Sequence, residues 1–166
     1  MHTSRNLMRC VAASIAAGAF VWLTSGSLPP MVASHFDGAG HANGFMPRSL
    51  YVALLVLIVF AVPLLLSVVP LIASGNAGER LNIPNKKYWL HPDRRGATLD
   101  YIARHARWFG YAVTIFLCYV HWLVVRANTL QPPQLSSPAL IAGLVAFFVA
   151  LLAWLAVLYI HFRTSA

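Results

Sequence analysis

Residues 50–72 read LYVALLVLIVFAVPLLLSVVPLI and contain no charged side chain. Three further runs are nearly as apolar, at about residues 7–28, 108–125 and 138–162. A helix needs about 20 apolar residues to cross the roughly 30 Å hydrocarbon core of a bilayer, and each run has about that length. The sequence therefore predicts an all-α membrane protein, with four transmembrane helices in a single domain.

The composition agrees with this class. The chain is 59% hydrophobic and only 10% charged, whereas a soluble domain is typically about a quarter charged. The net charge of +8 could suggest nucleic acid. However, most positive side chains lie beside the apolar runs, where they orient the protein and meet anionic lipid headgroups. We therefore expect the lipid bilayer as the partner of these charges, and no nucleic acid.

The positive charges also predict the orientation. Ten of the twelve Lys and Arg residues lie in the N-terminal segment, in residues 73–107 or at the C-terminus, and only Arg48 and Arg126 lie elsewhere. By the positive-inside rule, both termini and the loop 73–107 are cytoplasmic, and the Gly/Pro-rich loop 29–49 faces outward. The first run resembles a signal peptide, but it is long and no Ala-x-Ala site follows it, so we expect it to be retained.

The cytoplasmic loop is predicted to contain one amphipathic helix. Apolar residues recur there at helical spacing, at Leu99, Ile102, Ala103 and Ala106. Asp100 and Arg104 are four residues apart, with the acid first, which is the favourable order in a helix. We expect this helix to begin near Pro92 and to lie at the membrane interface before the third span.

The outer loop holds the most chemistry. His35, Asp37 and His41 lie within seven residues, and two imidazoles with a carboxylate are a possible zinc set. The alternative is a compact turn in which His35 and Asp37 bind backbone groups. The sequence has no HExxH, no cysteine pair and no G-x-S-x-G turn, so we expect no catalytic residues and no cofactor.

His121 is the one ionisable residue well inside the third run. Ionisable residues within membrane spans are candidates for function. His121 also stands beside interfacial aromatic residues, so a hydrogen-bonded packing histidine is the other interpretation. Few other polar side chains lie within the runs, which disfavours a channel or transporter pathway.

The outer loop resembles a known family pattern. The residues that carry the resemblance are Leu28-Pro29, His35-Phe36-Asp37, Gly40, Asn43-Gly44-Phe45 and Arg48. They are similar to the N-terminal domain of unknown function of the SdpI-type membrane proteins, over about residues 10–70. The stretch from Asn85 to Trp89 resembles the later SdpI region only loosely. His41 is not part of the pattern.

The resemblance implies a bacterial inner-membrane protein. The relatives that are best understood protect the producing cell from its own membrane-active peptide toxin and help to signal its presence. We therefore expect a binding or protective role, with a membrane-active peptide or another membrane protein as partner. The candidate binding residues are His35, Phe36, Asp37, Asn43, Phe45, Arg48, Tyr88, Trp89 and His121.

Two other functions stay open. One is a metal-dependent membrane enzyme that uses His35, Asp37 and His41. The other is an accessory subunit of a larger membrane complex.

Overall fold

The computed structural model describes residues 2–73 and 81–163. Four of its helices are long and apolar enough to cross a membrane. They are α1 (His2–Thr24), α2 (Arg48–Ala73), α4 (Pro92–Ala127) and α5 (Ser137–Arg163). The predicted all-α, multi-pass membrane fold is therefore confirmed.

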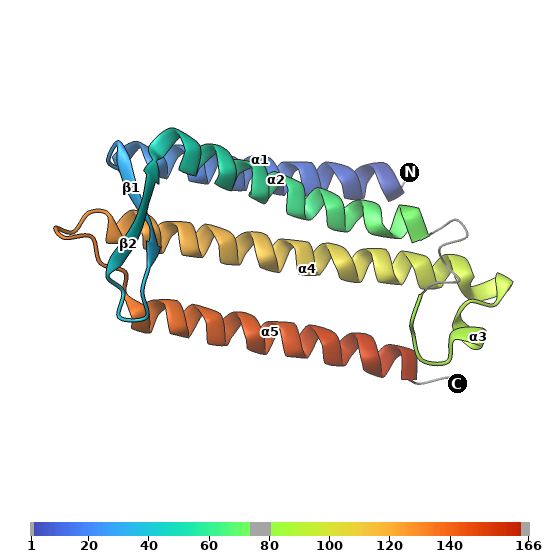
Figure 1. Ribbon diagram of the computed structural model, residues 1–166. Helices are drawn as coiled ribbons and strands as arrows, with labels where there is room; N and C mark the ends of the chain where they lie inside the picture. The colour runs from blue at the N-terminus through green and yellow to red at the C-terminus, as the bar shows by residue number, and fades with distance from the viewer. Residues whose placement is uncertain (1, 74–80, 164–166) are drawn as a thin grey trace.

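The four long helices run side by side (Figure 1). Helices α1 and α2 pack against each other and against α4, and α5 packs against the other side of α4. The start of α1, the end of α5 and the short helix α3 (Lys86–Trp89) lie at one end of the bundle. A β-hairpin lies at the opposite end, which we call the hairpin end.

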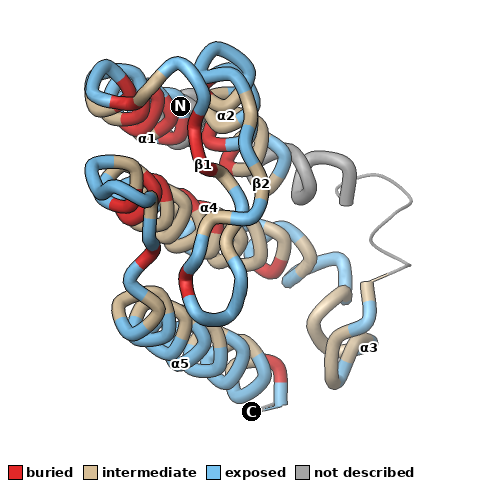
Figure 2. Tube along the Cα trace, turned by 60° about the vertical axis from the view of Figure 1, so that its left-hand side comes forward, coloured by how far each residue is buried: buried red, intermediate tan, exposed pale blue. Residues whose placement is uncertain are grey.

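The buried residues follow this arrangement. They gather along α1, α2 and α4, whereas α5 is mostly exposed (Figure 2). Small residues make the contact between α1 and α2 close: Ser14 and Ala17 are buried, and a Cβ added at Gly18 would lie 2.6 Å from Cε2 of Phe60. Small side chains let membrane helices approach in this way, because van der Waals packing drives their association.

Helix α4 is longer than the span predicted at residues 108–125. Its 36 residues extend over about 54 Å, well beyond the roughly 30 Å of a hydrocarbon core. The predicted amphipathic helix is present, but it does not end before the apolar segment, because the two form one continuous helix. Pro92 stands in the first turn, where its missing N–H costs nothing, and no later proline interrupts the hydrogen-bond ladder.

Most of the predicted Gly/Pro-rich outer loop, residues 29–49, forms a β-hairpin. A one-turn 3₁₀-helix, η1 (Ser25–Ser27), leads from α1 towards it. Strands β1 (Met31–Phe36) and β2 (Ala42–Pro47) pair antiparallel, and the ladder shifts register on both sides of His35. Helix α2 begins directly after β2.

Candidate functional site

The hairpin is held to the bundle by Asn128, the residue that follows α4. The backbone N–H of Ala33 donates to Oδ1 of Asn128 at 2.9 Å, and Nδ2 of Asn128 donates to the carbonyl of Ala33 at 3.0 Å. The same Nδ2 donates to the carbonyl of Val124 at 2.9 Å. One side-chain amide therefore pairs with β1 as a neighbouring strand would, and it also binds the last turn of α4.

A second attachment lies at the tip of the hairpin. The N–H of Leu135, between α4 and α5, donates to the carbonyl of Gly40 at 2.8 Å, and His41 forms a β-bridge with Gln134. Gly40 has a φ of +88°, and a Cβ there would collide with the carbonyl oxygen of Leu135. Only glycine fits this combination of backbone angle and close approach. Ser137 adds a longer contact, from its hydroxyl to the carbonyl of Gly38 at 3.4 Å.

Apolar side chains fill the space between the hairpin and the helices. Leu28, Val32 and Val124 form one buried cluster, and Leu123, Ala127 and Leu135 form another. Phe36 packs against both clusters. The hairpin is therefore a packed cap on one end of the bundle, and Phe36 contributes to that packing.

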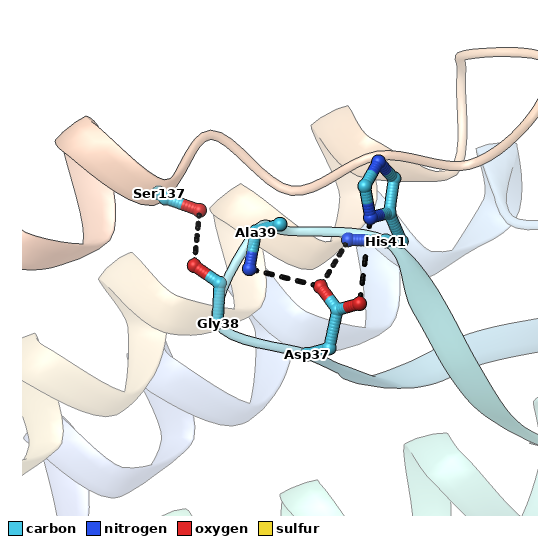
Figure 3. A network of polar contacts seen from close by, with 5 residues as sticks. All are labelled: Asp37, Gly38, Ala39, His41 and Ser137. Carbon is cyan, nitrogen blue, oxygen red and sulfur yellow. Dashed lines mark hydrogen bonds and ion pairs between the residues drawn. The ribbon is translucent and has the colours of Figure 1, made fainter.

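Asp37 organises the turn between the strands (Figure 3). Its Oδ1 accepts the backbone N–H groups of Ala39, at 2.9 Å, and His41, at 2.8 Å. Its Oδ2 lies 3.4 Å from Nδ1 of His41. The backbone N–H of His41 is the main reason that the pKa of Asp37 lies below its usual value. This geometry matches the turn interpretation, in which the carboxylate binds backbone groups.

His35 does not join this pair. Its Nδ1 lies 3.1 Å from the hydroxyl of the neighbouring Ser34, at the surface. Among residues 8–66 and 81–163, whose side chains the structure describes, no group of three or more His, Cys, Asp or Glu side chains is placed to hold a metal ion. The suggested set of His35, Asp37 and His41 thus reduces to one contacting pair, Asp37 with His41.

The remaining hairpin residues of the predicted set differ in their surroundings. Asn43 and Phe45, on β2, are exposed. Arg48 begins α2, and its Nη1 donates to the carbonyl of Leu28 at 3.0 Å. Its backbone N–H donates to the carbonyl of Pro30 at 2.9 Å. Arg48, where the chain leaves the hairpin, is thus bonded to residues 28–30, where the chain enters it.

His121, on α4, is fully buried where α4 meets α1 and α2 near the hairpin end. Its Nε2 is 2.8 Å from the hydroxyl of Thr24, and its Nδ1 is 2.9 Å from the hydroxyl of Tyr51. The Thr24 hydroxyl donates to the carbonyl of Phe20, so it accepts from Nε2–H, and Nδ1 then accepts from Tyr51. Every polar atom of the ring has a partner, as a packing histidine requires.

Tyr88 and Trp89 lie at the other end of the bundle. The indole Nε1 of Trp89 donates to the carbonyl of Phe162 at 3.0 Å, and the guanidinium of Arg94 lies 4.2 Å from the ring centre of Tyr88. The first contact docks α3 on the end of α5, and the second joins α3 to the first turn of α4. The structure thus divides the predicted binding residues into two groups at opposite ends of the bundle.

Sequence reasoning did not identify Thr24, Tyr51 or Asn128. Each is the polar residue at or near the end of an apolar run, which is a weak signal of a capping or bridging role. Their partners lie 70 to 97 residues away in the chain, and no local pattern reveals such pairings.

Comparison with known proteins adds one finding. The model of a family described as a domain of unknown function (DUF1648) matches residues 10–62, which include most of α1, the hairpin and the first part of α2. No curated protein and no solved structure matches the chain.

Proposed function

We propose that this protein binds an extended segment of a membrane-active peptide at its hairpin, and that it protects the cell or senses the peptide as SdpI-type proteins do. Binding occurs by addition of a strand to the outer edge of β2. The hairpin end faces outward from a bacterial inner membrane, with both termini in the cytoplasm. This orientation is supported by the excess of Lys and Arg at the opposite end and by the positive-inside rule.

The observation that carries the proposal is the unequal pairing of the two strands. Strand β1 has a partner on each side, since it pairs with β2 and with the Asn128 amide. Strand β2 pairs with β1 alone within the described chain, because the sheet has two strands. An unpaired strand edge presents N–H and C=O groups that an extended peptide can bind, and the side chains beside it then supply selectivity.

Two apolar side chains of the hairpin are exposed, Phe45 on the edge strand β2 and Met31 on β1. Phe45 is 54% exposed and Met31 is 53% exposed. Phe45 pairs with Ala33 and Met31 pairs with Pro47, so Phe45 and Met31 lie on one face of the hairpin. A membrane-active peptide is amphipathic, and it would place its apolar side chains against this face.

The test compares the sensitivity of cells to a panel of membrane-active peptides. We expect cells without the gene to be more sensitive to at least one peptide, and the wild-type gene to restore resistance. Phe45→Ser should not restore it, because the apolar face is lost. Leu130→Ser is the matched control, since Leu130 is 50% exposed at the same end but outside the hairpin. Unchanged sensitivity across the panel, with and without the gene, would contradict the proposal.

A separate measurement addresses the metal-dependent enzyme. Elemental analysis of the purified protein would overturn a purely binding role if it found stoichiometric metal that His41→Ala removes. Oδ1 of Asp37 already accepts two backbone N–H groups, so we expect no such metal.

A further inference from the structure

A cavity of about 590 Å³ lies between the end of α1 and the start of α2. Its lining residues are Trp22, Ser25, Gly26, Arg48, Ser49, Val52, Ala53 and Val56. The volume falls within the range of small-molecule sites, about 300–1,000 Å³. The outer edge of β2 does not contribute to it, so the cavity is distinct from the peptide site proposed above.

The lining of the cavity has a polar and an apolar part. Ser49, Val52, Ala53 and Val56 recur at helical spacing, so they form one face of α2. This face changes along α2 from a hydroxyl to aliphatic side chains, and Trp22 of α1 lies opposite. The polar part lies where the apolar run of α2 begins, which is the depth of lipid headgroups if α2 crosses a bilayer.

Three features of the polar part favour an anion. Helix α2 begins here, and the N-terminus of a helix carries a partial positive charge; its first turn contains no acidic residue. Arg48 adds a full positive charge, and it forms no ion pair with an acidic side chain of residues 8–66 or 81–163. Ser25 is only 4% exposed, and its hydroxyl has no hydrogen-bond partner within the described protein.

The unpaired hydroxyl of Ser25 is the independent sign of a ligand. A buried hydroxyl without a partner is costly, and native proteins rarely contain one. Ser25 lines the same cavity as Arg48 and Ser49. Its hydroxyl is enclosed, and a rotation of this short side chain would let it donate to an anionic group that Arg48 holds in the cavity.

We propose that this cavity binds a phospholipid with a net anionic headgroup, from the leaflet at the hairpin end. The phosphate lies at the polar part, where the Arg48 guanidinium, the Ser25 hydroxyl and the backbone N–H groups of Ser49 and Leu50 donate to it. One acyl chain lies along Val52 and Val56, beneath the indole of Trp22. Site-bound lipid thereby fills the gap that α1 and α2 leave at this end.

The test measures lipid binding to the full-length protein by native mass spectrometry. Purified protein in detergent is titrated with phosphatidylglycerol and, separately, with phosphatidylcholine of the same acyl chains. We expect phosphatidylglycerol to bind about tenfold more tightly, because the choline cation of phosphatidylcholine would lie beside the positive charge of Arg48. Arg48→Gln should remove this preference and Arg48→Lys should keep most of it. Arg126→Gln, which removes an exposed charge at the same end, should leave it unchanged.

A second pair of variants tests the apolar part without touching Arg48. Ala53→Phe fills the apolar part of the cavity and should weaken the binding of both lipids at least severalfold. Val145→Phe, on the exposed surface of α5, should leave the binding of both lipids unchanged. Millimolar inorganic phosphate should not displace phosphatidylglycerol, because it has no acyl chain. Equal affinity for the two lipids in the wild type, or displacement by inorganic phosphate, would overturn the assignment.

Discussion

Replacing Asn128 by alanine should release the hairpin from the bundle. The substitution removes both hydrogen bonds to Ala33 and leaves its N–H and C=O without partners, although Ala33 is fully buried. A buried polar group that loses its partner costs about 1–3 kcal/mol. Two such groups cost about 2–4 kcal/mol where water can partly reach them. The population of the undocked hairpin should therefore rise about 30- to 1,000-fold.

Hydrogen–deuterium exchange measures this population directly. We expect amides in residues 31–47 to exchange faster in Asn128→Ala by about the same factor, while amides of α5 keep their rates. Asn128→Asp should have an intermediate effect, because a carboxylate still accepts from the N–H of Ala33 but cannot donate to its carbonyl. Asn43→Ala makes the same chemical change at an exposed position of β2 and is the control. If the amides of residues 31–47 exchange at the same rates in Asn128→Ala and Asn43→Ala, the hydrogen bonds of Asn128 do not hold the hairpin to the bundle.

Three further predictions concern the same end of the molecule. His121→Leu should lower the melting temperature in detergent, because the buried hydroxyl of Tyr51 loses its partner; an unchanged melting temperature would show that this bond contributes nothing. Gly40→Ala should speed exchange at the hairpin tip, since the φ of +88° costs a side chain about 1–2 kcal/mol and the new Cβ meets a backbone carbonyl, whereas Gly38→Ala points into open space and should change nothing. The pKa of Asp37 is lower when folded, so its carboxylate stabilises the turn at neutral pH and this contribution disappears as the pH falls through the folded pKa. The protection factors of the tip amides, which correct for the intrinsic pH dependence of exchange, should then fall in the wild type but not in Asp37→Asn.

The long helices could be predicted from the sequence because their cause is local. Each depends on a continuous run of about 20 apolar residues, which any window of that length detects. The continuity of α4 was missed because Arg104 and Arg107 suggested that the polar segment was a separate element. Charge marks a change of surroundings along a helix, but it does not end one. Only a proline or a competing cap does so, and none follows Pro92 within α4.

The hairpin could not be predicted, because its cause is not local. The sequence MVASHF has no clear alternation, ANGFMP contains both glycine and proline, and the turn at Asp37 is longer than two residues. The pairing depends on Asn128, which lies 95 residues from Ala33 in the chain. The turn interpretation had both His35 and Asp37 binding backbone groups. Asp37 does so, whereas Nδ1 of His35 lies 3.1 Å from the side-chain hydroxyl of Ser34.

Helix α4 carries attachment points at both ends. Asn128 at its last turn holds the hairpin, and near its first turn Thr98 donates to the carbonyl of Trp89 and so holds α3. A straight rod of about 54 Å that tilts by about 5° moves one end by about 5 Å relative to the other. A tilt of α4 would therefore displace the hairpin at one end of the bundle and α3 at the other end together.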